Sequence, residues 1–419
     1  MRFVLVSTHI DQTTGYSKVS QNLVKQLATL SPKVKTFHFG FQRHPARANT
    51  RKYPEGVSSY DAAVNEDPKE EGFGFNKIHE YLEMVNPDVV MIYNDPLVVV
   101  KFIEGMKHER GKSPYKLWIY LDQVYVGIAP QLIEEINKHA DRVYCFTDIW
   151  KKQFLEYGPF PDVRVLEHAI DPTVFTNMLP DAAVAIRKNL SIPLDGTVFL
   201  NMNRNSQRKR LDLCVAGFVR LLARRPQSKN YLLIATNLDP QTGAHYDVNR
   251  IYAEELKLAG LDLQTYIRNL LLVDTSVKNL LSDDMINQIY NVCDIGINTS
   301  DGEGFGLCQL EHMYTGAPQI VTDVGSYRTF LDNTVAEFIP SDGRSYLAGS
   351  MPHGFYALTF PAEYVTDAME NILRDLDAKK KAVSNYTFKS WATVCDGLLE
   401  DLLTEVGGLT SIVSVPVKS

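Results

Sequence analysis

The sequence has little cysteine and no long apolar run. Its 419 residues include five cysteines, which lie far apart without a Cys-x-x-Cys pair or a Cys/His cluster of zinc spacing. Scattered cysteines of this kind are typical of a reducing compartment, so we expect a cytoplasmic protein without a disulfide framework. No stretch approaches the ~18 consecutive apolar residues that cross a bilayer. The sequence therefore predicts no transmembrane segment, although it leaves peripheral membrane contact open.

An excess of positive charge is also missing. The net charge of −7 argues against a dedicated nucleic-acid-binding protein, so we expect no nucleic-acid partner. Hydrophobic residues make up 45% of the chain and charged residues 22%, a balance typical of a folded enzyme. Because single hydrophobic cores stop growing at about 250–300 residues, the length predicts two domains.

Short apolar runs alternate with amphipathic stretches, and this pattern occurs twice. The first series begins with a strand at residues 3–6 and a helix at 17–30. The second begins with a strand at 197–201 and a helix at 209–224. Such alternation predicts an α/β protein with two Rossmann-like, doubly wound domains that face a central cleft.

The proline-rich segment 172–195 separates the two series. We therefore expect one domain at 1–177 and a second at 178–391, with a final helix near 392–405 that is able to pack back on the first. Two polar segments, 40–75 and 237–249, interrupt the alternation and are predicted to be long loops.

A glycine-rich segment follows a predicted strand of the second domain and precedes a helix. It reads Asn298-Thr-Ser-Asp-Gly-Glu-Gly-Phe-Gly-Leu-Cys-Gln-Leu-Glu311. Its glycines allow a ligand to approach the backbone, and the N–H groups at the helix start suit a phosphate or a sugar hydroxyl. Glu303 in the loop and Glu311 in the helix would reach two parts of one extended ligand. A glycine-rich turn with two solvated glutamates is the alternative.

A cationic segment, Asn203-Arg-Asn-Ser-Gln-Arg-Lys-Arg210, follows the first strand of the second domain. Its four cations crowd the start of a predicted helix, whose dipole is also positive there. A bound dianion would resolve that conflict, and Arg204 and Lys209 would then clamp a diphosphate. A solvated basic surface is the alternative.

Together these motifs resemble the retaining glycosyltransferases of family four, which have the GT-B fold. The resemblance runs from Arg2 to about Leu402, and small enzymes of this type encoded by large algal viruses are similar. Further matching segments lie at the linker, in the donor domain and in the tail: Ile170-Asp171 with Phe175, Tyr290 to Asp294, Gly316-Ala317-Pro318 and Phe388 to Trp391.

The resemblance implies a role for each matching residue. Arg204 and Lys209 would neutralise the donor diphosphate, Glu311 would bind the ribose, and Glu303 would hold the donor sugar. The resemblance also implies donor-binding positions in both domains: Gly15, Tyr290, Gly304, Phe305, Gly306 and Leu307.

One position departs from the family pattern. Where many relatives carry a histidine in the first domain, this chain has Asp122. We expect Asp122 to act as a catalytic group together with Glu303, Arg204 and Lys209, and His168 is the alternative to Asp122.

The implied activity is that of a retaining hexosyltransferase in glycan biosynthesis. It would transfer a hexose, with mannose from a GDP-sugar favoured, to a hydroxyl of a glycan, glycoprotein or lipid. No cofactor is expected, since the nucleoside diphosphate sugar is a substrate, and no metal ligands are expected either. The alternatives are a nucleotide-sugar epimerase of GT-B fold and a non-catalytic nucleotide-sugar-binding protein.

Overall fold

The chain divides into two compact units in the computed structural model. The structure describes residues 1–44, 51–64 and 66–412, with the backbone alone for 406–412. The first unit comprises Met1–Ala169, Gly349–Phe355 and the chain from Lys389 onwards, and the second comprises Ile170–Ala348 and Tyr356–Phe388.

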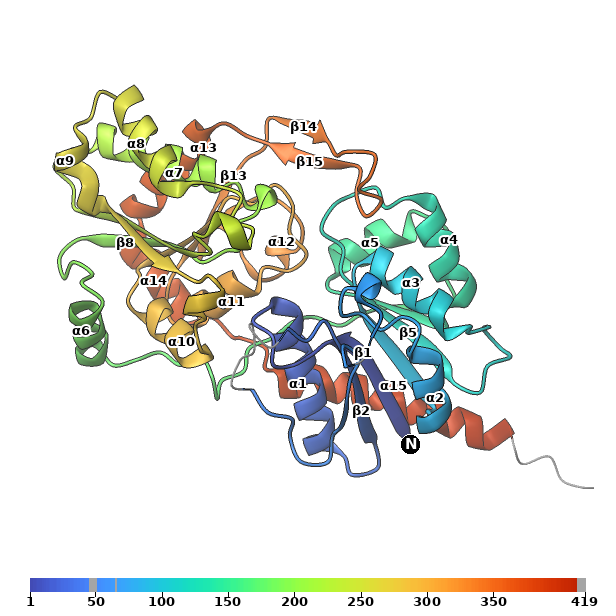
Figure 1. Cartoon of the computed structure of the whole chain (residues 1–419). Coiled ribbons are helices and arrows are strands. Elements are labelled where there is room, and N and C mark those ends of the chain that lie inside the picture. The colour runs from blue at the N-terminus through green and yellow to red at the C-terminus, as the bar shows by residue number, and fades with distance from the viewer. Residues whose placement is uncertain (45–50, 65, 413–419) are drawn as a thin grey trace, which may run out of the picture. The chain divides into compact units, whose positions relative to one another are not determined.

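The first unit is built on a parallel sheet in the order β3-β2-β1-β4-β5-β6-β7. The central strands are mostly apolar because both faces are covered; β4, for example, reads Val-Val-Met-Ile-Tyr-Asn and is buried throughout. Helix α15 packs against α1, as Figure 1 shows. The elements are β1(Arg2–Thr8), α1(Gly15–Leu30), β2(Lys35–Phe41), β3(Ser58–Asp61), α2(Ile78–Val85), β4(Val89–Asn94), α3(Pro96–Met106), β5(Lys116–Leu121), α4(Pro130–His139), β6(Arg142–Cys145), α5(Asp148–Leu155), β7(Val163–Val165) and α15(Trp391–Ile412).

The second unit repeats this plan with a parallel sheet in the order β10-β9-β8-β11-β12-β13. Its core includes Phe199 of β8 and Phe218 of α7, and α7 packs closely on α13 (Figure 1). The elements are α6(Pro180–Asn189), β8(Thr197–Asn201), η3(Gln207–Lys209), α7(Leu211–Arg224), β9(Asn230–Thr236), α8(Val248–Leu258), α9(Leu263–Tyr266), β10(Leu270–Asp274), α10(Asp283–Asn291), β11(Ile295–Asn298), α11(Leu307–Tyr314), β12(Gln319–Thr322), α12(Tyr327–Phe330), β13(Ala336–Ile339), β14(Gly343–Tyr346), β15(Tyr356–Thr359), α13(Ala362–Arg374) and α14(Leu376–Ser384).

Each sheet has one point at which its strand order reverses. In the first unit the chain winds outward from β1 in one direction and from β4 in the other, and β8 and β11 play the same parts in the second unit. Ligands of doubly wound sheets bind beyond the carboxyl ends of the strands at this point. The loops after β1, β4, β8 and β11 are therefore where a site is expected.

The predicted fold class is confirmed, while several elements differ from the prediction. The segment 172–195 contains helix α6 and lies within the second unit, which begins at Ile170 instead of residue 178. The C-terminal part of the second unit contains two helices, α13 and α14, that meet at Asp375, the C-cap of α13. An antiparallel hairpin of β14 and β15 has no counterpart in the prediction.

The segment 40–75, which was predicted to be a loop, contains strand β3 and a short 3-10 helix at Pro68–Glu70. Residues 45–50, with Arg47, and residue 65 lie outside the described part. Among the residues that the structure does describe, no helix has the length and hydropathy to span a membrane.

Candidate functional site

Two loops meet at the strand-order reversal of the second sheet. One follows β8 and leads through η3 into α7, and the other follows β11 and leads into α11. Their backbones are joined directly, because the amide of Asp301 donates to the carbonyl of Arg208 at 3.0 Å. The hydroxyl of Thr299 also donates to the carbonyl of Arg210 at 2.9 Å. The cationic segment and the glycine-rich segment are thus parts of one site.

Glu303 is the charged centre of this site. The Nζ of Lys209 donates to its Oε2, and the Nη1 of Arg208 lies 3.4 Å from its Oε1. Lys209 and Glu303 are each 8% exposed. An ammonium group has three donors, so the hydrogen bond to Glu303 leaves Lys209 able to donate to a second anion.

Two polar side chains, one at the end of β11 and one in the loop after it, also lie near Glu303. The Oγ of Ser300 lies 3.3 Å from Oε2, and the Nδ2 of Asn298 lies 3.5 Å from the same oxygen. Burial alone would raise the pKa of Glu303, but Lys209 and Arg208 hold that pKa at about 2. The carboxylate is therefore ionised at neutral pH.

The crowding of four cations predicted for 203–210 is relieved by carboxylates of the protein itself. Arg210 pairs with Asp212 at 2.9 Å, while Arg208 and Lys209 contact Glu303. Arg204 is exposed in the loop after β8. The positive charge of Arg208 and Lys209 is hence organised around Glu303.

Glycine is required at position 306 of the glycine-rich loop. Gly306 has a φ of 94°, and a Cβ there would lie 2.3 Å from the ring of Tyr327. Leu307 then begins α11. The side chain of Phe305 stacks on Phe330 with ring centroids 5.2 Å apart, so a donor-binding role for Phe305 is limited to its backbone, as it is for Gly304.

Glu311 lies one helical turn into α11, and Tyr290 of α10 contacts it. The Tyr290 hydroxyl donates to the Oε2 of Glu311 at 3.0 Å, and both side chains are buried. Burial and the nearby carboxylate raise the pKa of Tyr290 well above its usual range, so the phenol stays protonated. The ring of Tyr290 also stacks on His312, with centroids 5.2 Å apart. Tyr290 therefore fixes the orientation of Glu311.

The first-unit candidates lie at the corresponding edge of the other sheet. Gly15 is the first residue of α1, and Asp122 directly follows β5. The hydroxyl of Tyr16 donates to the Oδ2 of Asp122 at 2.5 Å, and the amide of Asp122 donates to the carbonyl of Asn94 at 3.0 Å. Asp122 is thereby held at the ends of β4 and β5.

His168, the predicted alternative to Asp122, belongs to the aromatic core of the first unit. Its ring centroid lies 4.3 Å from that of Phe146 and 5.8 Å from that of Trp391. Burial lowers the pKa of His168 to about 3. The side chain therefore packs as a neutral ring within the core, which argues against a role in contacting substrate.

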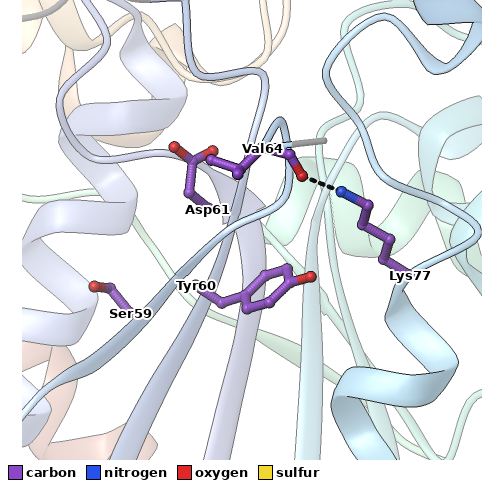
Figure 2. A pocket seen from close by; sticks show the side chains of 5 residues that line it. All are labelled: Ser59, Tyr60, Asp61, Val64 and Lys77. Atoms are coloured by element: carbon purple, nitrogen blue, oxygen red, sulfur yellow. Dashed lines mark hydrogen bonds between the residues drawn. The ribbon is translucent and has the colours of Figure 1, made fainter. Parts of the chain in front are cut away.

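The first unit also contains an open pocket of about 480 Å³ that was not predicted (Figure 2). It lies at the carboxyl end of β3 and is lined by Ser59, Tyr60, Asp61, Val64 and Lys77. The Nζ of Lys77 donates to the carbonyl of Val64, so this ammonium group is already engaged at the rim. Within the described residues, no group of three or more His, Cys, Asp or Glu side chains is placed to hold a metal ion.

Two contributors to the site were not selected from the sequence. Arg208 stands next to Lys209 in the same cationic run, and the run alone does not tell which cations point to the carboxylate. Tyr16 follows the selected Gly15, and its partner lies 106 residues away. The one available signal was that each residue lies between a predicted strand and the predicted helix that follows it.

Comparison with solved structures shows the fold. Sucrose-phosphate synthase from Thermosynechococcus elongatus superposes with a TM-score of 0.67 at 16% identity, covering 97% of this chain and 100% of that one. Anabaena Alr3699/HepE, solved in complex with UDP and glucose, gives 0.63 at 12% identity, covering 96% and 100%. The chain has the GT-B fold.

Residues 198–348 match the family described as glycosyl transferases group 1. A D-inositol 3-phosphate glycosyltransferase from Geodermatophilus obscurus is 27% identical over 205 residues, 48% of this chain and 42% of that protein. A mannosylfructose-phosphate synthase from Agrobacterium fabrum is 26% identical over 158 residues, 37% and 32% of the two. The chain thus spans about two fifths or less of the length of these two relatives. The resemblance drawn from the motifs is confirmed, and the chain is a relative of the group 1 glycosyltransferases.

Proposed function

We propose that the chain is a retaining hexosyltransferase that uses a nucleoside diphosphate sugar. The observation that carries the proposal is the joining of the cationic loop to the glycine-rich loop at the reversal point of the second sheet. There Lys209 and Glu303 place an ammonium group beside a carboxylate. This pairing suits a ligand with a diphosphate next to hydroxyl groups.

In this proposal the bond between the anomeric carbon and the diphosphate breaks, and its electrons stay with the diphosphate. The acceptor oxygen forms the new bond to the anomeric carbon, and its proton passes to the diphosphate. Lys209 and Arg204 stabilise the negative charge that develops on the leaving group, so no divalent metal is required. The amides at the start of α11 face the same ligand. Glu303 accepts hydrogen bonds from hydroxyls of the sugar, and Glu311, fixed by Tyr290, accepts them from the ribose.

The acceptor is a hydroxyl of a glycan, glycoprotein or lipid, bound by the first unit. The names of the relatives add a phosphorylated cyclitol as a further candidate for this acceptor. GDP-mannose is the donor that the resemblance favours. A UDP-sugar is the competitor to test, because HepE was solved with UDP.

Calorimetry with GDP, UDP and ADP tests the donor site directly. We expect GDP to bind more tightly than UDP and ADP. The affinity for GDP should be unchanged by EDTA. The absence of binding by all three would overturn the proposal. If UDP binds most tightly, the donor is a UDP-sugar instead of a GDP-sugar, and the proposed hexosyltransferase activity is retained.

Transfer is then measured with the matching sugar nucleotide and a panel of methyl α-mannoside and D-inositol 3-phosphate. The anomeric coupling constant in the NMR spectrum of the product reports the configuration. An α-product from GDP-mannose supports retention, whereas a β-product contradicts it. Transfer that stops in EDTA and returns with Mn²⁺ would contradict the metal-independent mechanism.

A further inference from the structure

The loop after β1 carries a histidine–aspartate pair that no motif predicted. The Nδ1 of His9 lies 2.7 Å from the Oδ1 of Asp11. Both residues are buried, each with 7% of its surface exposed. Because β1 borders the point where the first sheet reverses its order, this loop lies where a doubly wound sheet binds its ligand.

The chemistry of Asp11 fixes the protonation of the His9 ring. Gln12 donates to the Oδ1 of Asp11 at 2.8 Å, and Arg43 donates to its Oδ2 at 2.8 Å. Burial would raise the pKa of Asp11, but these donors and His9 lower it, so the carboxylate is ionised. An ionised carboxylate only accepts hydrogen bonds, so the 2.7 Å contact places the proton on Nδ1. In this tautomer the longer, 3.4 Å approach of the Asp11 amide to Nδ1 is not a hydrogen bond.

The other ring nitrogen is then a hydrogen-bond acceptor. Burial and Arg43 lower the pKa of His9, and Asp11 and Asp61 only partly oppose this, so the ring is neutral at pH 7. A neutral imidazole with its proton on Nδ1 has a lone pair on Nε2. Among the described residues, none donates a hydrogen bond to this atom, while 8% of the side-chain surface stays exposed.

The backbone around His9 holds the ring in this position. The amide of His9 donates to the carbonyl of Phe41 at 2.9 Å. Gly40 leaves room for the ring, since a Cβ there would lie 2.6 Å from its Cδ2 atom. Tyr53 meets the ring edge-on, with centroids 5.3 Å apart. The acceptor nitrogen is therefore presented by a fixed ring and not by a mobile side chain.

The neighbouring histidine has no such acceptor available. The Nε2 of His38 contacts the hydroxyl of Ser7 at 2.8 Å, and its Nδ1 contacts the hydroxyl of Tyr53 at 2.8 Å. Both nitrogens of His38 are thus used inside the core. The difference identifies His9 as the histidine of this cluster that is suited to meet a ligand.

A ligand for a neutral Nε2 must bring its own donor. A hydroxyl qualifies, whereas a phosphate dianion does not, because it carries no proton to donate. We propose that the Nε2 of His9 accepts a hydrogen bond from a hydroxyl of the sugar or polyol acceptor, and that Asp11 acts as the positioning residue for the ring. This assignment rests on the proposed function, in which the first unit binds the acceptor.

The test compares His9→Leu, which has no acceptor atom, with His9→Gln, whose Oε1 is able to accept. His79→Gln, at a partly exposed position of helix α2, is the matched control. We expect His9→Leu to raise the KM for the better of methyl α-mannoside and D-inositol 3-phosphate at least 10-fold. We expect His9→Gln to recover part of that loss, and the control and the affinity for GDP or UDP to stay unchanged. A folded His9→Leu variant with the wild-type acceptor KM would overturn the assignment.

Nitrogen NMR of the labelled full chain provides a readout that does not depend on transfer. The His9 signals, assigned through His9→Gln, should show a protonated Nδ1 and an unprotonated Nε2 at pH 7. Asp11→Asn should shift the ring toward the other tautomer while the protein still melts cooperatively. The opposite tautomer in the wild type would overturn the inference. A wild type that shows the expected tautomer but binds no nucleoside diphosphate would refute the proposed function instead.

Discussion

The two units share a strand order, but the chemistry at the reversal point differs between them. In the second unit, Lys209 lies against the carboxylate of Glu303. In the first unit, the loop after β1 places neutral His9 beside Asp11, which also accepts from Arg43, and the hydroxyl of Tyr16 donates to Asp122 after β5. The shared strand order determines which loops lie at the reversal point. The sequence of those loops determines whether the site suits a phosphate or a hydroxyl.

The largest expected effect comes from the carboxylate of the second unit. Glu303→Gln should lower kcat about 10²–10³-fold, the range for losing one preorganised electrostatic contact in the transition state. The affinity for free nucleoside diphosphate should stay near the wild-type value, because the sugar is absent from that ligand. Steady-state kinetics together with calorimetry measure both quantities.

Glu311→Gln is the matched variant in the same domain. It removes a ribose contact that is equal in the ground and transition states, so KM should rise while kcat changes little. Two folded variants with the same kinetic pattern would show that the ends of the donor are assigned wrongly.

Lys209→Ala should weaken nucleoside diphosphate binding by roughly 1.5–3 kcal/mol, the range for a hydrogen bond to a charged group. Lys229→Ala is the control, since Lys229 is exposed and pairs with Asp195 in the same domain. Asp122→Asn should leave this affinity unchanged, which sharpens the contrast between the units. Equal nucleotide-binding curves for wild type and Lys209→Ala would favour the alternative that the cationic loop is a solvated basic surface.

Acid should weaken the second unit through Glu303. Its folded-state pKa of about 2 lies below the ordinary value of 4.5. The contribution to the unfolding free energy is therefore complete above pH 4.5 and is lost as the pH falls toward 2. Urea unfolding at a series of pH values should show this loss in the wild type and a smaller one in Glu303→Gln. If the free energy of unfolding depends on pH in the same way in both proteins, the ion pair of Glu303 with Lys209 is contradicted.

The smallest expected effect is that of Tyr290→Phe. The change removes one hydrogen bond to Glu311 and should weaken nucleoside diphosphate binding by about 0.5–1.5 kcal/mol. Tyr314→Phe, on helix α11, is the control, because its ring contacts Phe388 instead of the site. If Tyr290→Phe binds nucleotide as tightly as wild type, the role of Tyr290 is limited to packing in the core.

The sequence predicted the fold class and the two loops of the second unit, because both are local patterns. Glycine spacing and the apolar strands before it mark the loop that carries Glu303. The contact of Glu303 with Lys209 was out of reach, since it requires β8 and β11 to be neighbours although β9 and β10 lie between them in the chain. Strand order is set by packing over the whole sheet, which no local pattern encodes.

The first unit was less predictable for the same reason. Asp122 and Tyr16 lie 106 residues apart, and the link of His9 to Asp11 depends on how one loop turns. The sequence did not indicate that the polar ring of His168 is packed among aromatic side chains. A histidine near the end of a strand looks the same in sequence whether it lines a site or fills a core.

The segment Gly349–Phe355 belongs to the first unit, although both of its flanking strands belong to the second. The amide of Phe355 donates to the carbonyl of Val126 at 2.8 Å, and the amide of Ala129 donates to the carbonyl of Pro352 at 2.7 Å. Neither unit is therefore encoded by one uninterrupted stretch of gene. A fragment that stops at the linker lacks this segment and α15, so half-proteins and simple domain swaps should fold poorly unless they exchange these pieces together.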